Sequence, residues 1–162
     1  MADVLRYRWG DTNPVVCAVI TIQAVSIGDV IGLSSGNAYR AEDHAWTNLS
    51  ATQFNFCANF LGVASQRKVA NSAQTTGGGA ANRMRVDTEG VFEFNCPATT
   101  FEIGNLVGME QQSTTTLLES QKVALVTDVT RAIGRIAEKK TNTSTTCKVA
   151  IFSKIMIGGP QA

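Results

Sequence analysis

A short glycine-containing unit occurs twice in this chain and constrains the fold more than any other feature. Residues 26–33 read Ser-Ile-Gly-Asp-Val-Ile-Gly-Leu and residues 102–109 read Glu-Ile-Gly-Asn-Leu-Val-Gly-Met, with three of eight positions identical and four more conservatively replaced. In each copy a glycine, which tolerates positive φ, precedes an Asp or Asn whose side chain can bond its own backbone, and this predicts a tight turn before a strand. The later glycine of the unit is typical of a bulge or a close backbone approach. The predicted structural turn residues are Gly28, Asp29, Gly32, Gly104, Asn105 and Gly108.

A second echo follows the first in the same order. Residues 60–68 (Phe-Leu-Gly-Val-Ala-Ser-Gln-Arg-Lys) resemble residues 132–140 (Ala-Ile-Gly-Arg-Ile-Ala-Glu-Lys-Lys). Two correlated matches indicate a duplicated β unit. We therefore expect an all-β fold with little helix, a small β-barrel or sandwich in one domain over residues 15–162, with pseudo-repeats of roughly 15–90 and 91–157. Whether the halves form one barrel or two stays open.

Local patterns predict the individual elements. Val15 to Val25 alternates with the period of a strand, and residues 84–95 read as a hairpin that turns at Glu89-Gly90. Residues 42–59 keep neither period, so we expect a loop with one or two helical turns, capped from the cluster at residues 47–50. Residues 75–81 read as a flexible hairpin loop and residues 141–146 as a turn-rich connection. The last strand is expected at residues 147–157.

Charge and cysteine content exclude several classes of protein. Fourteen basic and thirteen acidic residues give the 162-residue chain a net charge of +1, so a nucleic-acid partner is not expected. Val15 to Val25 is too short to span a membrane, and we expect a soluble chain made in the cytoplasm. The cysteines form no Cys-x-x-Cys pair, which predicts buried free thiols and no metal site. They are Cys17, Cys57, Cys96 and Cys147.

The first fourteen residues carry bulky amphipathic side chains without a periodic apolar pattern. They read as an N-terminal arm, residues 1–14, that ends in a Gly-Asp-Thr-Asn-Pro turn. Arg, Tyr and Trp are typical of contacts to a neighbouring molecule, and an equally good interpretation folds Trp9 back over one end of the barrel. The predicted interface residues, toward a partner or another subunit, are Arg6, Tyr7, Arg8 and Trp9.

No catalytic constellation is recognisable. The single histidine, His44, lies near Glu42 and Asp43, and Ser34 precedes it without a Gly-x-Ser-x-Gly elbow. Adjacent ligands in an extended chain share a direction poorly, so a metal site there is disfavoured. We expect a protein that is not an enzyme, with no catalytic residues and no cofactor.

The order of short motifs resembles that of the capsid decoration, or cement, proteins of tailed bacteriophages. The resemblance covers roughly Val15 to Ile157, and order and spacing carry it because each motif alone has low specificity. Asn105 stands where the family usually has Asp. The motifs are Ile27-Gly-Asp-Val30, Phe60-Leu-Gly-Val-Ala64, Val86-Asp-Thr-Glu-Gly-Val91, Ile103-Gly-Asn-Leu-Val-Gly108 and Ala132-Ile-Gly134.

This resemblance implies a small β-barrel structural protein on the outer surface of the virion head. Its implied partners are the phage major capsid protein, whose capsomers it would cement, and itself in a homotrimer. A phage tail, fibre or baseplate module is the alternative, including a receptor- or carbohydrate-binding domain that uses Trp9, Tyr39 and Trp46.

Overall fold

The computed structural model describes residues 3–4, 6–20, 22–71 and 82–157, and it is mostly β. Barrel 1 contains β2 (Val15–Val19), β3 (Val30–Ser34), β4 (Asn37–Arg40), β5 (Phe60–Ala64) and β6 (Arg83–Asp87). Barrel 2 contains β7 (Glu89–Phe101), β8 (Leu106–Gln111), β9 (Leu118–Leu125), β10 (Gly134–Ile136) and β11 (Lys140–Phe152). β1 (Tyr7–Trp9) adds to barrel 2 beside β7. The helical elements are η1 (Ala41–Asp43), α1 (Leu49–Ala58), η2 (Val129–Arg131) and α2 (Lys154–Ile157).

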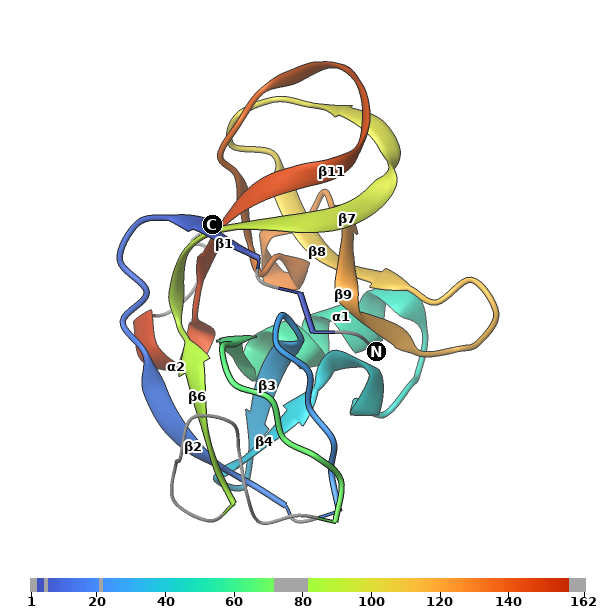
Figure 1. Cartoon of the computed structure of the whole chain (residues 1–162). Helices are drawn as coiled ribbons and strands as arrows, with labels where there is room; N and C mark the ends of the chain where they lie inside the picture. The colour runs from blue at the N-terminus through green and yellow to red at the C-terminus, as the bar shows by residue number, and fades with distance from the viewer. Residues whose placement is uncertain (1–2, 5, 21, 72–81, 158–162) are drawn as a thin grey trace.

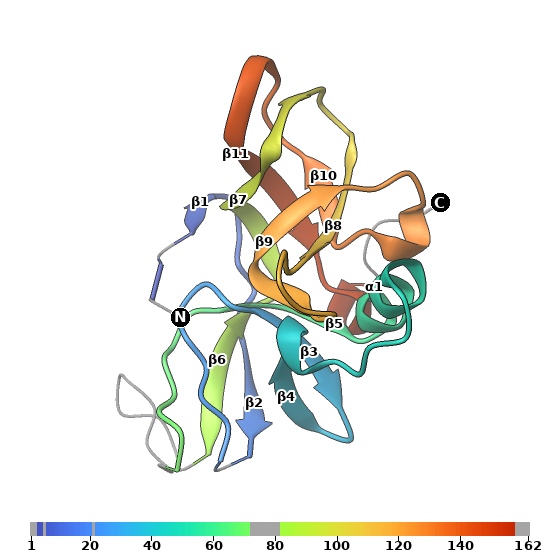
Figure 2. The same cartoon turned by 90° about the vertical axis from the view of Figure 1, so that its right-hand side faces the viewer.

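The two barrels have the same topology, which confirms the duplicated all-β fold. In barrel 1 the pairs β2–β6, β6–β5, β5–β3 and β3–β4 are antiparallel, and a parallel β2–β4 pair closes the barrel. In barrel 2 the pairs β7–β11, β11–β10, β10–β8 and β8–β9 are antiparallel, and a parallel β7–β9 pair closes it. Figure 1 shows barrel 1 below barrel 2, and Figure 2 shows α1 on one side of the junction between them.

The repeated glycine units form equivalent turns, one in each barrel. Gly28 has a φ of 94° and Gly104 a φ of 87°, so both need the left-handed backbone that glycine adopts freely. The Asp29 carboxylate accepts the Ser26 N–H at 2.8 Å, and the Asn105 amide oxygen accepts the Glu102 N–H at 3.0 Å. Each glycine also donates its N–H to the strand alongside, Gly28 to Ala64 and Gly104 to Ile136, both at 2.9 Å. These matching bonds explain why the unit is repeated in the sequence.

The second sequence echo marks a close approach between strands. Ile31 pairs with Gly62 in barrel 1, as Val107 pairs with Gly134 in barrel 2. A Cβ added at Gly62 would lie 2.0 Å from the Asp87 carbonyl oxygen. A Cβ at Gly134 would lie 2.3 Å from that of Ala150. Both positions therefore exclude any side chain.

The later glycine of each unit also has a structural reason. Strand β3 changes register between Ile31 and Gly32, which confirms the predicted bulge. A Cβ at Gly32 would lie 2.6 Å from the Tyr39 ring, and one at Gly108 would lie 2.6 Å from the Arg131 carbonyl oxygen. Each glycine thus leaves room for a different neighbour, which is Tyr39 of β4 at Gly32 and Arg131 of η2 at Gly108.

Helix α1 is longer than the one or two turns predicted. Its cap was located correctly, because the Asn48 side chain accepts the Ala51 N–H at 3.0 Å. The buried positions are Thr52, Gln53, Phe56 and Cys57, which follow helical spacing. Two of them are polar, so the apolar pattern of the sequence did not indicate a helix.

The hairpin predicted at residues 84–95 is wrong. Strand β6 pairs with β2 and β5, whereas β7 pairs with β1, β9 and β11, so the two strands belong to different barrels. Thr88 lies between them and donates its N–H to the Thr12 carbonyl oxygen at 2.8 Å. Apolar and polar residues alternate along both strands, as they would in a hairpin, but this alternation does not identify the strand with which each one pairs.

Three other boundaries differ from the prediction. The strand expected over residues 15–25 ends at Val19, and Val25 forms an isolated bridge with Lys68. Residues 141–146 are part of β11, because threonine is a good strand former although the Ser/Thr/Asn cluster resembles a loop. The last strand ends at Phe152 and is followed by α2. The loop predicted at residues 75–81 lies outside the described residues.

The two barrels pack against each other through a common apolar core. Barrel 1 encloses a compact apolar cluster, including Ile31, Leu61 and Met84. A larger cluster fills barrel 2 and continues through Phe56 of α1 to Phe60 of β5. Side chains of barrel 1 and α1 therefore extend the core of barrel 2, and the two barrels pack as one body.

Candidate functional site

The N-terminal residues run along barrel 2 and place three bulky side chains on its outside. Tyr7 pairs with Phe92 and Trp9 with Val91, and the Glu93 N–H bonds the Arg6 carbonyl oxygen at 2.8 Å. All three residues of β1 are exposed, and Trp9 retains 44% of its accessible surface. Figure 1 shows β1 beside β7.

The exposed face around β1 combines aromatic and charged groups. Arg8 forms an ion pair with Glu93 at 3.1 Å, and the Lys148 ammonium lies 5.2 Å from the centroid of the Trp9 ring. Lys148 also forms an ion pair with Glu138. Exposed ion pairs of this kind add little stability, whereas Arg and Trp are frequent anchors of protein interfaces. The face has the chemistry of a protein contact surface.

Arg6 does not belong to that face, although the sequence grouped it there. Its side chain is buried, and its guanidinium donates to the Gln121 side chain at 2.9 Å and to the Glu93 carbonyl oxygen at 3.1 Å. The guanidinium also lies 5.6 Å from the centre of the Phe94 ring. Burial lowers the pKa of Arg6, but an arginine remains charged. Arg6 therefore fastens the arm to the barrels and is not available to a partner.

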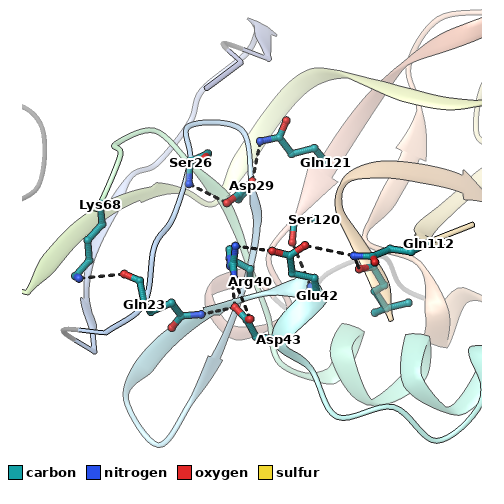
Figure 3. A network of polar contacts seen from close by, with 11 residues as sticks. Gln23, Ser26, Asp29, Arg40, Glu42, Asp43, Lys68, Gln112, Ser120 and Gln121 are labelled. Atoms are coloured by element: carbon teal, nitrogen blue, oxygen red, sulfur yellow. Dashed lines mark hydrogen bonds and ion pairs between the residues drawn. The ribbon is translucent and has the colours of Figure 1, made fainter. Parts of the chain in front are cut away.

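Asp29 connects the first repeated turn to the arm and to barrel 2 (Figure 3). One carboxylate oxygen accepts the Ser26 N–H within the turn, and the other accepts the Gln121 amide N–H at 2.7 Å. Gln121 in turn accepts from Arg6, so a buried relay joins barrel 1, barrel 2 and the arm. Burial raises the pKa of Asp29, and its hydrogen bonds oppose that rise. Its counterpart Asn105 is exposed, and among the described residues the Asn105 side chain bonds only the Glu102 N–H of its own turn.

A second set of polar contacts continues the junction beside Asp29 (Figure 3). Arg40 forms ion pairs with Glu42 and with Asp43, the latter at 2.8 Å. The Glu42 N–H donates to the Ser120 hydroxyl at 3.2 Å, and Gln112 donates to the Glu42 carboxylate at 3.3 Å. Glu42 thus links barrel 1 to β9 and to the loop before it. These charges are satisfied by one another, so the cluster joins the barrels and presents no free acid or base.

His44 lines a hollow of about 320 Å³ at one end of barrel 1. Its Nδ1 lies 3.2 Å from the Tyr39 hydroxyl, and burial lowers the pKa of His44 while raising that of Tyr39 to about 12. Ser34 and Asp43 line the same hollow. No hydrogen bond joins Ser34, Asp43 and His44 in the described chain, because Asp43 bonds Arg40 and His44 bonds Tyr39. The arrangement is not that of an activated nucleophile.

The cysteines are free thiols, as the sequence predicts. Cys57, Cys96 and Cys147 are buried, whereas Cys17 is only half-buried. Burial raises the pKa of Cys57 to about 12 and that of Cys17 to about 11, so neither is a reactive thiolate at neutral pH. Within the described residues, no group of three or more His, Cys, Asp or Glu side chains is placed to hold a metal ion.

The junction residues were not identified from the sequence. Ser120, Gln121 and Gln112 are polar residues in or near a strand, and in isolation that pattern predicts solvent-facing positions. Ser120 and Gln121 are buried and Gln112 is half-buried, because residues of barrel 1 pack against β9 and the loop before it. A polar side chain buried by a neighbouring barrel leaves no local signal in the sequence.

In the described part of the chain, no helix has both the length and the apolar character needed to cross a membrane. Comparisons with family models, with curated proteins and with solved structures gave no match to this chain.

Proposed function

We propose that this chain is a structural virion protein that binds the outer surface of a phage head and cements the capsomers of the major capsid protein. The observation that carries the proposal is the outward face of β1, where Tyr7, Arg8 and Trp9 are exposed on a strand paired with β7. The motif order that resembles the cement proteins supports it, because those motifs form the turns and strands of both barrels.

The task of a cement is physical, and it requires no catalytic group. A protein that binds only the assembled shell stabilises that shell by mass action, by an amount that grows with its free concentration. A stable contact buries on the order of 1,200–2,000 Å² in total, and a few Trp, Tyr and Arg residues usually supply most of its energy. The charges at the barrel junction are satisfied internally, and the β1 face offers aromatic and charged side chains for such a contact.

A homotrimer made in the host cytoplasm and located on the outer surface of the head completes the proposal, and this part rests on the resemblance. Light scattering of the purified protein and symmetry averaging of decorated heads measure the oligomeric state. A monomer in both experiments would remove the trimer from the proposal without affecting decoration.

The proposal is tested by adding purified protein to expanded heads of the parent phage that lack it. We expect density on the outside of the shell and greater resistance of the decorated heads to heating. Trp9→Ala should lower occupancy at least about tenfold if Trp9 anchors the contact. Phe54→Ala, at another exposed aromatic residue, is the matched control. Heads that remain bare with wild-type protein would refute the proposal.

The alternative, a tail or receptor-binding module, has a weaker structural basis. Trp46 packs against the core of barrel 2, Tyr39 contacts Phe56 and His44, and Trp9 lies on the face of β1. Tyr39 and Trp46 both pack against the same core cluster, whereas Trp9 lies on the outer face of β1, so the three aromatic side chains are not arranged as one exposed platform. Density restricted to the tail in images of the particle would favour this alternative.

A further inference from the structure

The two equivalent turns differ in what covers them. A Cβ added at Gly28 would lie 2.5 Å from the Val4 carbonyl oxygen and 3.2 Å from Arg6 Nε, because the arm passes directly over this turn. A Cβ added at Gly104 would meet no atom of the described chain within 4 Å. One copy of the same structural element is covered by an extended segment, and no segment of the described chain covers the other.

The arm recognises the first turn through the backbone of Ile27. The Val4 N–H donates to the Ile27 carbonyl oxygen at 2.9 Å, and the Ile27 N–H donates to the Asp3 carboxylate at 2.9 Å. An acidic side chain followed by an extended apolar residue thus satisfies both backbone groups of Ile27. In the second turn the equivalent residue is Ile103, and the described residues provide no partner for its N–H or carbonyl group.

The surface around the second turn suits a similar segment. Ile103 retains 71% of its accessible surface and Leu125 retains 40%. A hollow of about 210 Å³ beside the turn is lined by Asn105, Leu106 and Leu125, together with Val126 and Thr127. The exposed Ile103 side chain and the hollow beside it form an apolar patch in contact with water. Exposed apolar patches of this kind frequently mark sites of contact with another molecule.

Charge next to the turn complements an acidic partner. Arg135 donates to the Gly104 carbonyl oxygen at 3.1 Å, and Lys139 forms an ion pair with Glu102 at 3.0 Å. Arg135 therefore bonds the turn itself, and Lys139 pairs with the first residue of the turn. A partner carboxylate that approached the Ile103 N–H, as Asp3 approaches Ile27, would come near these two cations.

We propose that the second turn, residues 102–105 with Leu125, is a docking site for an extended segment of the shell subunit. The segment carries an acidic residue followed by an apolar one, as Asp3 and Val4 do at the first turn. This proposal rests on the function proposed above. A cement holds at least two neighbouring subunits, so it needs a contact surface in addition to the β1 face.

The test compares two aspartate substitutions at equally exposed isoleucines. Ile103→Asp places a carboxylate at the second turn. Ile22→Asp places a carboxylate on barrel 1, at an isoleucine that also retains 71% of its accessible surface. Both variants should keep the wild-type circular dichroism spectrum and melting temperature. We expect Ile103→Asp to weaken binding to expanded heads at least about tenfold, while Ile22→Asp binds as wild type does.

Each outcome decides the proposal. If Ile103→Asp decorates heads like the control, the docking site is wrong, and loss of binding on Trp9→Ala would still support the cement function. If both isoleucine variants weaken binding equally, added negative charge explains the loss and the docking site is also wrong. If wild-type protein leaves the heads bare, the cement function and the docking site fall together.

Discussion

The two equivalent glycines allow the contribution of the arm to be measured with an internal control. Gly28→Ala and Gly104→Ala place the same methyl group on the same left-handed backbone in the two repeated turns. At Gly28 the methyl group would lie 2.5 Å from the Val4 carbonyl oxygen, whereas at Gly104 it would meet no atom of the described residues within 4 Å. Because the Val4 carbonyl group is backbone, it cannot rotate away, and the arm has to move.

The expected losses of stability follow from these contacts. A left-handed conformation costs a non-glycine residue about 1–2 kcal/mol, which is the whole expected loss for Gly104→Ala. Displacing the arm removes two hydrogen bonds of Ile27, worth about 0.5–1.5 kcal/mol each. It also disturbs the buried contact of Arg6 with Gln121. We expect Gly28→Ala to lose about 3–5 kcal/mol in total.

Denaturant unfolding and calorimetry measure the difference between the two variants. At about 2–4 °C per kcal/mol for a chain of this size, Gly104→Ala should lower the melting temperature by roughly 2–8 °C and Gly28→Ala by roughly 6–20 °C. Hydrogen exchange at the Val4 amide should accelerate only in Gly28→Ala. Equal stabilities within about 0.5 kcal/mol, with Val4 still protected, would refute the role assigned to the arm.

Three further predictions concern the barrels and their junction. Gly134→Ala should destabilise the protein by about 3 kcal/mol or more in the same unfolding assay, since its Cβ would lie 2.3 Å from a carbonyl oxygen; a loss as small as that of Gly104→Ala would contradict the close approach. Burial raises the pKa of Asp29, so the Asp29 carboxyl group holds its proton more tightly in the folded state than in the unfolded chain. Ionisation of Asp29 therefore lowers the free energy of unfolding as the pH rises above the ordinary aspartate pKa of about 3.9. The stability advantage of wild type over Asp29→Asn, measured by denaturant midpoints, should therefore be largest at low pH and shrink toward neutrality; growth of the advantage with pH would overturn this assignment. Ellman's reagent should modify Cys17 slowly and leave Cys57 unmodified in the native protein, and rapid reaction of Cys57 would show that its site opens.

The parts of the fold that could be predicted are those in which a backbone requirement restricts the residue. Gly28, Gly62, Gly104 and Gly134 lie where a side chain is strained or excluded, so the duplication is still visible in the sequence. The cap of α1 was also predictable, because Asn48 bonds a residue three positions away. Features that depend only on neighbouring residues leave a signal in a single sequence.

The parts that could not be predicted depend on distant residues. The strands on either side of Thr88 resemble a hairpin, and only their pairing partners assign them to different barrels. Arg6 reads as a surface residue until Gln121, which is 115 positions away, is brought beside it. The same limit applies to the candidate site, since the sequence left open whether Trp9 faces a neighbouring molecule or folds back over the barrel, and it did not predict the burial of Arg6.

Divergence between the repeated turns gives the two barrels different roles. Both turns need a side-chain oxygen to accept a backbone N–H, and Asp29 and Asn105 meet that need equally well. Asp29 has a second oxygen that accepts from Gln121, whereas the amide nitrogen of Asn105 cannot accept a hydrogen bond. The carboxylate is therefore found where the turn must connect the barrel to another part of the molecule, and the amide where the described chain makes no such connection. The second turn carries the exposed Ile103, and no described segment lies over Gly104, which is why we propose that another molecule docks there.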